Sequence, residues 1–202
     1  MERKFEFPDG ATPLFDHSGL IPSWVLDIRD LNRVEGENII SAQRKYFRNP
    51  VKTPKKWFNS KELKLIHKEM FGNVWEWAGV YRKSVTSIGI QPGYISRQLE
   101  EFCLEVAFWF EHPVDFTFLE MSARVHHRLV FIHPFENGNG RFSRLVADRF
   151  LFSCRRPFPS WPNQINREGG ERKEYINSLK EADMGNYEPL ILFMKKLGAQ
   201  EI

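Results

Sequence analysis

Residues 133–144 combine residue types and spacings that could bind and transfer a phosphate group. Gly138, Asn139 and Gly140 form a turn, and a helical pattern resumes at Arg141. The start of a helix offers unpaired backbone N–H groups and the positive end of a dipole, and glycines let an anion approach that backbone closely. We therefore predict that this loop is an anion cradle.

Three side chains extend this prediction. Arg141 and Arg144 are three residues apart on the new helix, so their planar guanidinium groups can converge on an extended anion such as a polyphosphate. His133 enters from the opposite wall, and an imidazole with a pKa of ~6.5 can accept a proton from a hydroxyl nucleophile. Together the parts indicate transfer of a phosphorus group to an alcohol. Each feature alone has an ordinary explanation: solvated arginines, a helix-capping histidine, or a common glycine turn.

Two helices must position these groups. The pair Thr117 and Glu120 predicts a capped start for a helix over 118–132, which is apolar on two sides and should cross the core. Pro134 disfavours helical geometry at the residue before it, so the imidazole of His133 should lie at the end of that buried helix.

The rest of the chain predicts a mainly α bundle. Residues 84–95 differ, because apolar positions flank a Gln-Pro-Gly turn, and we predict a short β-hairpin there. Residues 1–23 lack periodicity and predict an irregular arm over the domain. Further helical patterns occupy 31–47, 59–72, 95–110, 141–152, 173–182 and 186–197.

Composition excludes several classes of protein. The chain has 202 residues, with 29 basic and 26 acidic side chains, so nothing indicates a nucleic-acid or membrane surface. Cys103 and Cys154 are far apart in sequence, which favours a reducing compartment over a disulfide framework. No signal-peptide core or long apolar run is visible. We expect a cytoplasmic protein that neither enters membranes nor binds nucleic acid directly.

The string HPFENGNGRFSR at 133–144 resembles the motif of the Fic family, H-P-F-x-D/E-G-N-G-R-x-x-R, with one departure. Residues 74–82 resemble the segment that leads to the target-docking flap of Fic domains. Residues 9–14 and 19–22 resemble the bacterial branch called mobile mystery protein B. The resemblance implies a Fic-type helical bundle with a β-hairpin flap, made of an N-terminal arm and inhibitory helix at 1–55 and a Fic core at 56–202.

The resemblance also implies an activity, the transfer of AMP from ATP to a hydroxyl of a target protein, with Mg²⁺ or Mn²⁺ as cofactor. His133 would be the general base and Phe135 the anchor of the loop in the core. Gly138, Asn139 and Gly140 would hold the α and β phosphates, Arg141 the β phosphate and Arg144 the γ phosphate. The flap would align a target segment carrying a Ser, Thr or Tyr hydroxyl by strand addition. Its residues would be Ser84, Val85, Thr86, Ser87 and Ile88.

The departure concerns the metal. The family's acidic residue that holds Mg²⁺ corresponds to Asn137, whose amide oxygen can ligate a hard cation but brings no negative charge. Since a bridging metal supplies several kcal/mol in such a transfer, we expect weaker metal binding and a slow enzyme. Glu136 should point elsewhere.

A second resemblance concerns regulation. Residues 31–36 resemble the inhibitory motif S/T-x-x-x-E-G/N, although Leu31 departs from its first position. In the family this glutamate pairs with the second arginine, so Glu35 would pair with Arg144 and exclude the γ phosphate. The motif would also explain Gly36 within a helical pattern. The alternative is an ordinary solvated glutamate.

Three readings of function stay open. The first is protein adenylylation, and the second is a Fic enzyme that uses another phosphate-containing donor, as the phosphocholine transferases and Doc kinases do. The third is a degenerate Fic fold that binds nucleotide or a protein partner without turnover, for which Asn137 is the best support. The mobile mystery branch implies a companion DNA-binding protein. The sequence leaves open the target and whether the chain forms a homodimer.

Overall fold

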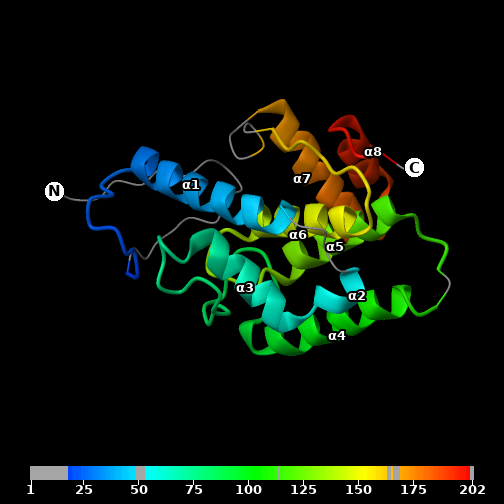
Figure 1. The fold of residues 1–202 in the computed structure, drawn as a ribbon, viewed down its shortest axis with the longest axis horizontal. Helices are drawn as coiled ribbons and strands as arrows, with labels where there is room; N and C mark the ends of the chain where they lie inside the picture. The colour runs from blue at the N-terminus through cyan, green and yellow to red at the C-terminus, as the bar shows by residue number, and fades with distance from the viewer. Residues whose placement is uncertain (1–17, 49–52, 113, 163–164, 166–168, 201–202) are drawn as a thin grey trace.

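The computed structural model describes residues 18–48, 53–112, 114–162, 165 and 169–200, and in these ranges the fold is mainly α (Figure 1). The long N-terminal helix α1 spans Ile28–Phe47 and includes Gly36. The expected helices are confirmed, with ends that differ by a few residues. After α1 the helices are, in chain order, α2 (Pro54–Trp57), α3 (Ser60–Phe71), the short 3-10 helix η1 (Pro92–Tyr94), α4 (Ile95–Trp109), α5 (Phe118–Ile132), α6 (Asn139–Ser153), α7 (Gly170–Asp183) and α8 (Glu188–Lys196).

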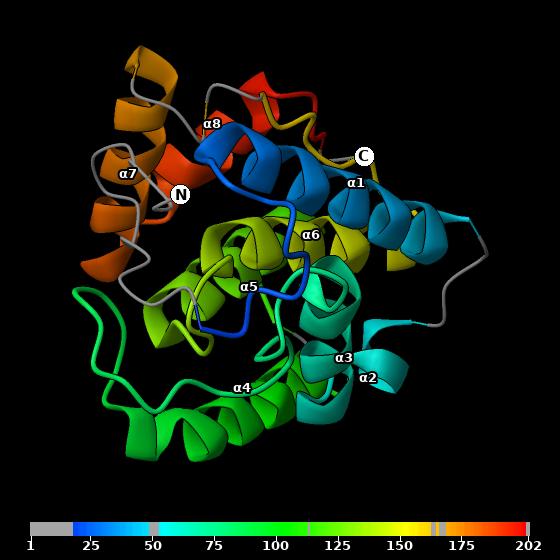
Figure 2. The same ribbon diagram turned by 90° about the vertical axis from the view of Figure 1, so that its left-hand side faces the viewer.

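Helices α5 and α6 form the centre of the bundle (Figure 2). They pack along one another, and the Ser122 hydroxyl of α5 donates to the Ala147 carbonyl of α6 at 3.1 Å. A larger apolar core fills the space between this pair and α1, α3 and α4, and a smaller one joins the pair to α7 and α8. Being apolar on two sides, α5 serves both cores, as its sequence pattern predicts.

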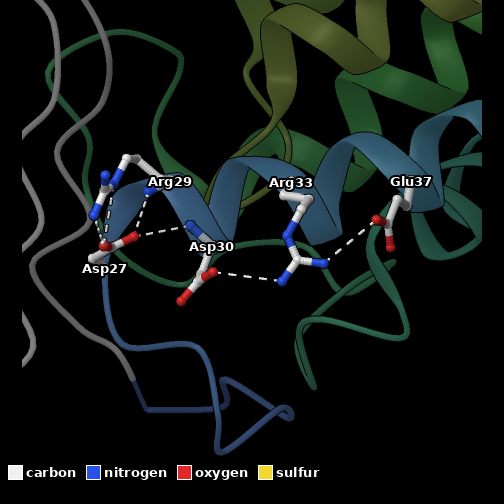
Figure 3. Close-up of polar contacts among 5 residues, drawn as sticks. All are labelled: Asp27, Arg29, Asp30, Arg33 and Glu37. Carbon is white, nitrogen blue, oxygen red and sulfur yellow. Dashed lines mark hydrogen bonds and ion pairs between the residues drawn. The ribbon is translucent and has the colours of Figure 1, made fainter.

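Local signals set the helix ends. The Asn59 side chain accepts from the Glu62 amide at 2.9 Å, and Thr117 accepts from the Glu120 amide at 3.1 Å, so both predicted N-caps are confirmed. At the start of α1, Asp27 accepts from the amides of Arg29 and Asp30, and exposed ion pairs follow along the helix (Figure 3). This face of α1 is solvated, so its other face is left to pack on the bundle.

The N-terminal arm lies on the domain where the structure describes it. The Ile21 amide donates to the Val74 carbonyl at 2.9 Å, and the Glu76 amide donates to the Gly19 carbonyl at 2.8 Å. Leu20 and Trp75 form an isolated antiparallel bridge between these bonds. The expectation of an irregular arm therefore holds for residues 18–23, and its first part, residues 1–17, lies outside the described residues.

The predicted hairpin at 84–95 is wrong, because these described residues form a loop that ends in η1. The cause is Arg82. Its guanidinium group donates to the carbonyls of Ser84 (2.8 Å) and Ile90 (2.5 Å), one at each end of the segment. A hairpin would need carbonyls at both ends of the turn for its ladder. Arg82 takes two of them, and the segment closes around a side chain instead.

Within the described ranges, no helix is both long enough and apolar enough to cross a membrane.

Candidate active site

His133 lies at the end of α5, where the sequence places it. It caps the helix in the left-handed conformation, with φ 52°, and its amide donates to the Leu129 carbonyl at 3.1 Å. Its Nδ1 lies 3.3 Å from the Val130 carbonyl, a contact that puts the proton on Nδ1 and the lone pair on Nε2. Burial, followed by the nearby Arg82 cation, lowers the pKa of His133 to about 4. The imidazole is therefore neutral at pH 7, as a general base must be.

The loop from α5 to α6 is held by its own side chains. The Asn139 amide accepts from the Phe135 backbone N–H at 2.9 Å and donates to the Phe135 carbonyl at 2.7 Å, closing the turn over residues 135–139. The Phe135 ring is fully buried and meets Phe142 edge to face. Phe135 thus lies where an anchor should be, and the Asn139 side chain holds the turn rather than reaching outward.

His67 of α3 also contacts this loop, although no sequence pattern singled it out. Its Nε2 donates to the Asn137 carbonyl, and its Nδ1 accepts from the Gly79 amide, both at 3.0 Å. The ring stacks on Phe135 with 3.7 Å between centroids. Burial lowers the pKa of His67 to about 3, so the neutral ring can use one nitrogen as donor and the other as acceptor.

The two glycines of the predicted cradle differ in whether the surrounding structure leaves room for a side chain. Gly138 adopts φ 77°, and a Cβ there would lie 2.5 Å from the Phe71 ring, so the fold itself requires glycine. Gly140 lies in the first turn of α6, where a Cβ would meet only the Arg144 guanidinium, at 3.7 Å. The fold therefore has room for a side chain at Gly140, and packing does not require glycine there.

Arg141 lies in the first turn of α6 and pairs with Glu35 of α1. Its Nη1 is 2.5 Å from Glu35 Oε2, while the other carboxylate oxygen accepts from Trp75 Nε1 at 2.7 Å. The Glu35 side chain is 4% exposed and that of Arg141 is 25% exposed. Glu35 is therefore not a solvated glutamate, and it covers one of the two candidate phosphate ligands.

The expected pairing of Glu35 with Arg144 is not the one in this structure. Arg144 is buried, and its side chain hydrogen-bonds Tyr175 of α7 and lies 5.8 Å from the ring centres of Tyr175 and Trp161. Residues three apart on a helix point in different directions by about 60°. Arg141 consequently faces α1, and Arg144 faces α7.

Asn137 and Glu136 decide whether a divalent cation fits this site. The Asn137 amide oxygen accepts from the Gly138 backbone N–H at 2.6 Å, and Glu136 accepts from the Lys83 amide (3.3 Å) and the Ser84 hydroxyl (2.6 Å). Glu136 points away from the cradle, as expected. No cluster of three or more His, Cys, Asp or Glu side chains that could hold a metal occurs among the described residues. One neutral oxygen already engaged by the loop fits Mg²⁺ poorly, since Mg²⁺ favours carboxylates.

The predicted flap residues lie beside this site, in the loop that replaces the hairpin. Val85 is 71% exposed and Ile88 46% exposed, so both present apolar side chains to solvent. Thr86 donates its hydroxyl to the Ile88 carbonyl at 2.6 Å, which curls the tip at Ser87.

Comparison with known proteins supports the resemblance in the motif. Residues 57–151 match the Fic/DOC family. The chain is 29% identical over 164 residues to a protein adenylyltransferase Fic of Aedes aegypti and 29% identical over 138 residues to protein adenylyltransferase fic-1 of Caenorhabditis elegans. These alignments cover 77% and 65% of this chain but 30% and 25% of the relatives. The chain thus spans under a third of these relatives' length.

Solved structures share the fold. Fic-1 of C. elegans, residues 134–508, superposes with a TM-score of 0.64 at 24% identity, covering 91% of this chain and 52% of that one. BepC of Bartonella tribocorum, solved with bound AMPPNP, gives 0.64 at 18% identity, covering 88% and 90%. These likenesses establish a Fic-type, mainly α fold.

Sequence reasoning missed four contributors: His67, Trp75, Arg82 and Tyr175. Each is an isolated polar or aromatic residue in an apolar or loop context, which sequence patterns assign to the core. A signal existed for Trp75 and Arg82, because both stand in the segment 74–82 that resembles the lead-in to a Fic flap.

Proposed function

We propose that this chain transfers AMP from ATP to a hydroxyl of a target protein. The observation that carries the proposal is the short distance along the chain between two features. The buried, neutral imidazole of His133 caps α5, and α6, with Gly140 in its first turn, begins at Asn139, so only residues 134–138 separate His133 from α6. Arg141 and Arg144 rise from the same first turns of α6. The family domain and the names of the relatives point to the same chemistry.

In the proposed reaction, the backbone N–H groups at the start of α6 and the two arginines hold the polyphosphate. His133 Nε2 takes the proton from the target hydroxyl as its oxygen attacks the α phosphorus in line. The bond from the α phosphorus to the bridging oxygen breaks, and pyrophosphate leaves with that electron pair. The products are AMP-modified protein and pyrophosphate, and the proton on His133 passes to solvent.

Two features make the enzyme slow and restrained in this proposal. Glu35 occupies Arg141, so nucleotide must displace a buried carboxylate before the β phosphate can bind. Asn137 offers no charge to a divalent cation, so Mg²⁺ or Mn²⁺ would be held chiefly by the phosphates of ATP. We propose Glu35 as an inhibitory residue that acts through Arg141 rather than through Arg144.

The segment 84–88 is the proposed docking place for the target. Its exposed apolar side chains and its position beside His133 suit an extended peptide that brings a Ser, Thr or Tyr hydroxyl to the imidazole. Membership of the mobile mystery protein B branch, its companion DNA-binding protein, the domain division near residue 55 and a cytoplasmic location stay predictions. Of the two segments that carry the branch resemblance, residues 9–14 lie outside the described residues and residues 19–22 lie within them.

Intact-mass analysis tests the proposal. The chain is incubated with ATP, GTP, UTP or CTP and Mg²⁺ or Mn²⁺, with a His133→Ala variant as control, and ATP affinity is measured by calorimetry. An AMP increment on the chain or on an added acceptor that disappears in His133→Ala supports adenylylation. A mass increase equal to one phosphate, or to a nucleotide other than AMP, would show that the chain uses another donor and would rule out AMP transfer.

A second function has one observation in its favour, the Asn137 oxygen turned onto the Gly138 N–H. On this alternative the chain binds nucleotide or a protein partner without turnover. ATP binding without any mass increment, also after Glu35→Gln, would favour it.

A further inference from the structure

Arg82 is a buried cation whose side chain donates hydrogen bonds to four backbone carbonyls. The residue is 2% exposed, and its Nε donates to the His133 carbonyl at 2.6 Å. Nη1 donates to Ser84, and Nη2 donates to Ile90 at 2.5 Å and to Ile132 at 3.4 Å. One guanidinium group therefore joins the end of α5 to both ends of the segment 84–90.

Elementary helix chemistry explains why a cation belongs there. The last carbonyls of a helix have no N–H partner within it, and they carry the negative end of the dipole. Pro134 follows the helix and has no N–H to offer. A guanidinium satisfies such carbonyls, and its planar fork can reach acceptors on several sides at once, which an ammonium on a flexible chain cannot do.

Two further contacts press the segment 84–90 onto His133. Gly89, with φ 104°, comes so close that a Cβ there would lie 2.5 Å from His133 Cβ and 2.8 Å from Arg82 Nη2. Glu136, three residues after His133, accepts from the Lys83 amide and the Ser84 hydroxyl. The segment is thus fastened at both ends, and Gly89, near its second end, packs against His133.

We propose that Arg82 is a positioning residue that couples the segment 84–90 to the imidazole of His133. The target peptide would dock on a loop whose two ends share one guanidinium group with the histidine carbonyl, so seating of the peptide and orientation of the base are linked. The consequence for catalysis rests on the function proposed above. The coupling itself is a property of the chain without nucleotide.

The test compares Arg82→Lys and Arg82→Gln with Arg149→Lys as a matched control. Arg149 is also buried, at 8% exposed, but its partners are Glu62, at 2.8 Å, and the rings of Tyr46 and Trp57. Two readouts need no nucleotide: hydrogen exchange of residues 84–90 by mass spectrometry, and titration of the His133 ring proton by NMR.

We expect exchange in 84–90 to be at least tenfold faster in both Arg82 variants. In Arg82→Gln the titration midpoint of His133 should rise, because a cation that disfavours its protonated form is gone. Arg149→Lys should change neither readout. Exchange within twofold of the parent chain and an unshifted His133 titration in the Arg82 variants would overturn the coupling.

Two additions keep the test decisive. If neither Arg82 variant folds, Gly89→Ala, whose Cβ would crowd both His133 Cβ and Arg82 Nη2, must give the same faster exchange. An unchanged rate would refute the proposal. If AMP transfer is observed, Arg82→Lys should lower kcat and leave ATP affinity within twofold of the parent value. A chain that shows the coupling but no transfer would refute the proposed function and leave this inference standing.

Discussion

Replacing Glu35 with glutamine should release Arg141, the proposed ligand of the β phosphate. The carboxylate accepts from both Arg141 and Trp75, whereas a neutral amide has one oxygen and can serve only one of these donors well. Glutamine keeps the length of the side chain and its helix propensity, so α1 should stay intact. Arg141 would then be available to the β phosphate.

The magnitude follows from the pair that ATP must displace. A hydrogen bond to a charged group contributes about 1.5–3 kcal/mol, and each 1.4 kcal/mol is about tenfold in affinity. Because Arg141 is 25% exposed, solvent already screens it in part, and we take the lower end. ATP should bind Glu35→Gln about tenfold more tightly, and the free energy of unfolding without nucleotide should fall by about 1–2 kcal/mol.

Isothermal calorimetry with ATP, together with urea unfolding, measures both effects. Glu37→Gln is the matched control, since Glu37 lies on the same helix but is solvated and pairs with Arg33 at 3.7 Å (Figure 3). It should shift neither ATP affinity nor stability by more than about 0.5 kcal/mol. Unchanged ATP affinity in Glu35→Gln, with weaker binding in Arg141→Ala, would refute inhibition by Glu35. Unchanged binding in Arg141→Ala as well would remove Arg141 from the phosphate site.

Three further predictions concern the loop. Gly140→Ala should leave the free energy of unfolding unchanged or raise it by up to ~1 kcal/mol, and it should weaken ATP binding in calorimetry. Gly138→Ala should lower the free energy of unfolding by about 1–3 kcal/mol, because its Cβ meets the Phe71 ring. Equal ATP affinity in the parent chain and Gly140→Ala would disprove the cradle. Asn137→Asp should strengthen Mg²⁺-dependent ATP binding and raise the transfer rate at least tenfold, and an unchanged rate at saturating Mg²⁺ would remove the metal argument. Since burial and Arg82 lower the pKa of His133 to about 4, its neutral form persists above that pH and is lost as the pH falls through it; kcat/KM should therefore stay level from pH 8 to about 5, and an acidic limb near 6.5 would contradict the burial of the imidazole.

Signals between neighbouring residues account for the local features of this protein. The N-caps Asn59 and Thr117 set helix starts, and Pro134 sets the end of α5 at the residue before His133. A helix after the glycine turn was also predicted, although it begins at Asn139 rather than at Arg141, because Gly138 in the left-handed conformation already serves as its N-cap. These features depend on residues a few positions apart, whose backbone preferences act within one or two helical turns, so a motif of twelve residues was enough to place the candidate site.

Which groups meet across the bundle could be learned only from the packing of the helices. Glu35 and Arg141 are 106 positions apart, and the face of α6 that α1 covers depends on how the helices pack. The loss of the predicted hairpin has the same origin, because the carbonyls of Ser84 and Ile90 bind a side chain held at the end of α5. A period-two apolar pattern indicates which backbone could form strands. It does not show that Arg82, just before the segment, binds these carbonyls because it is itself held at the end of α5.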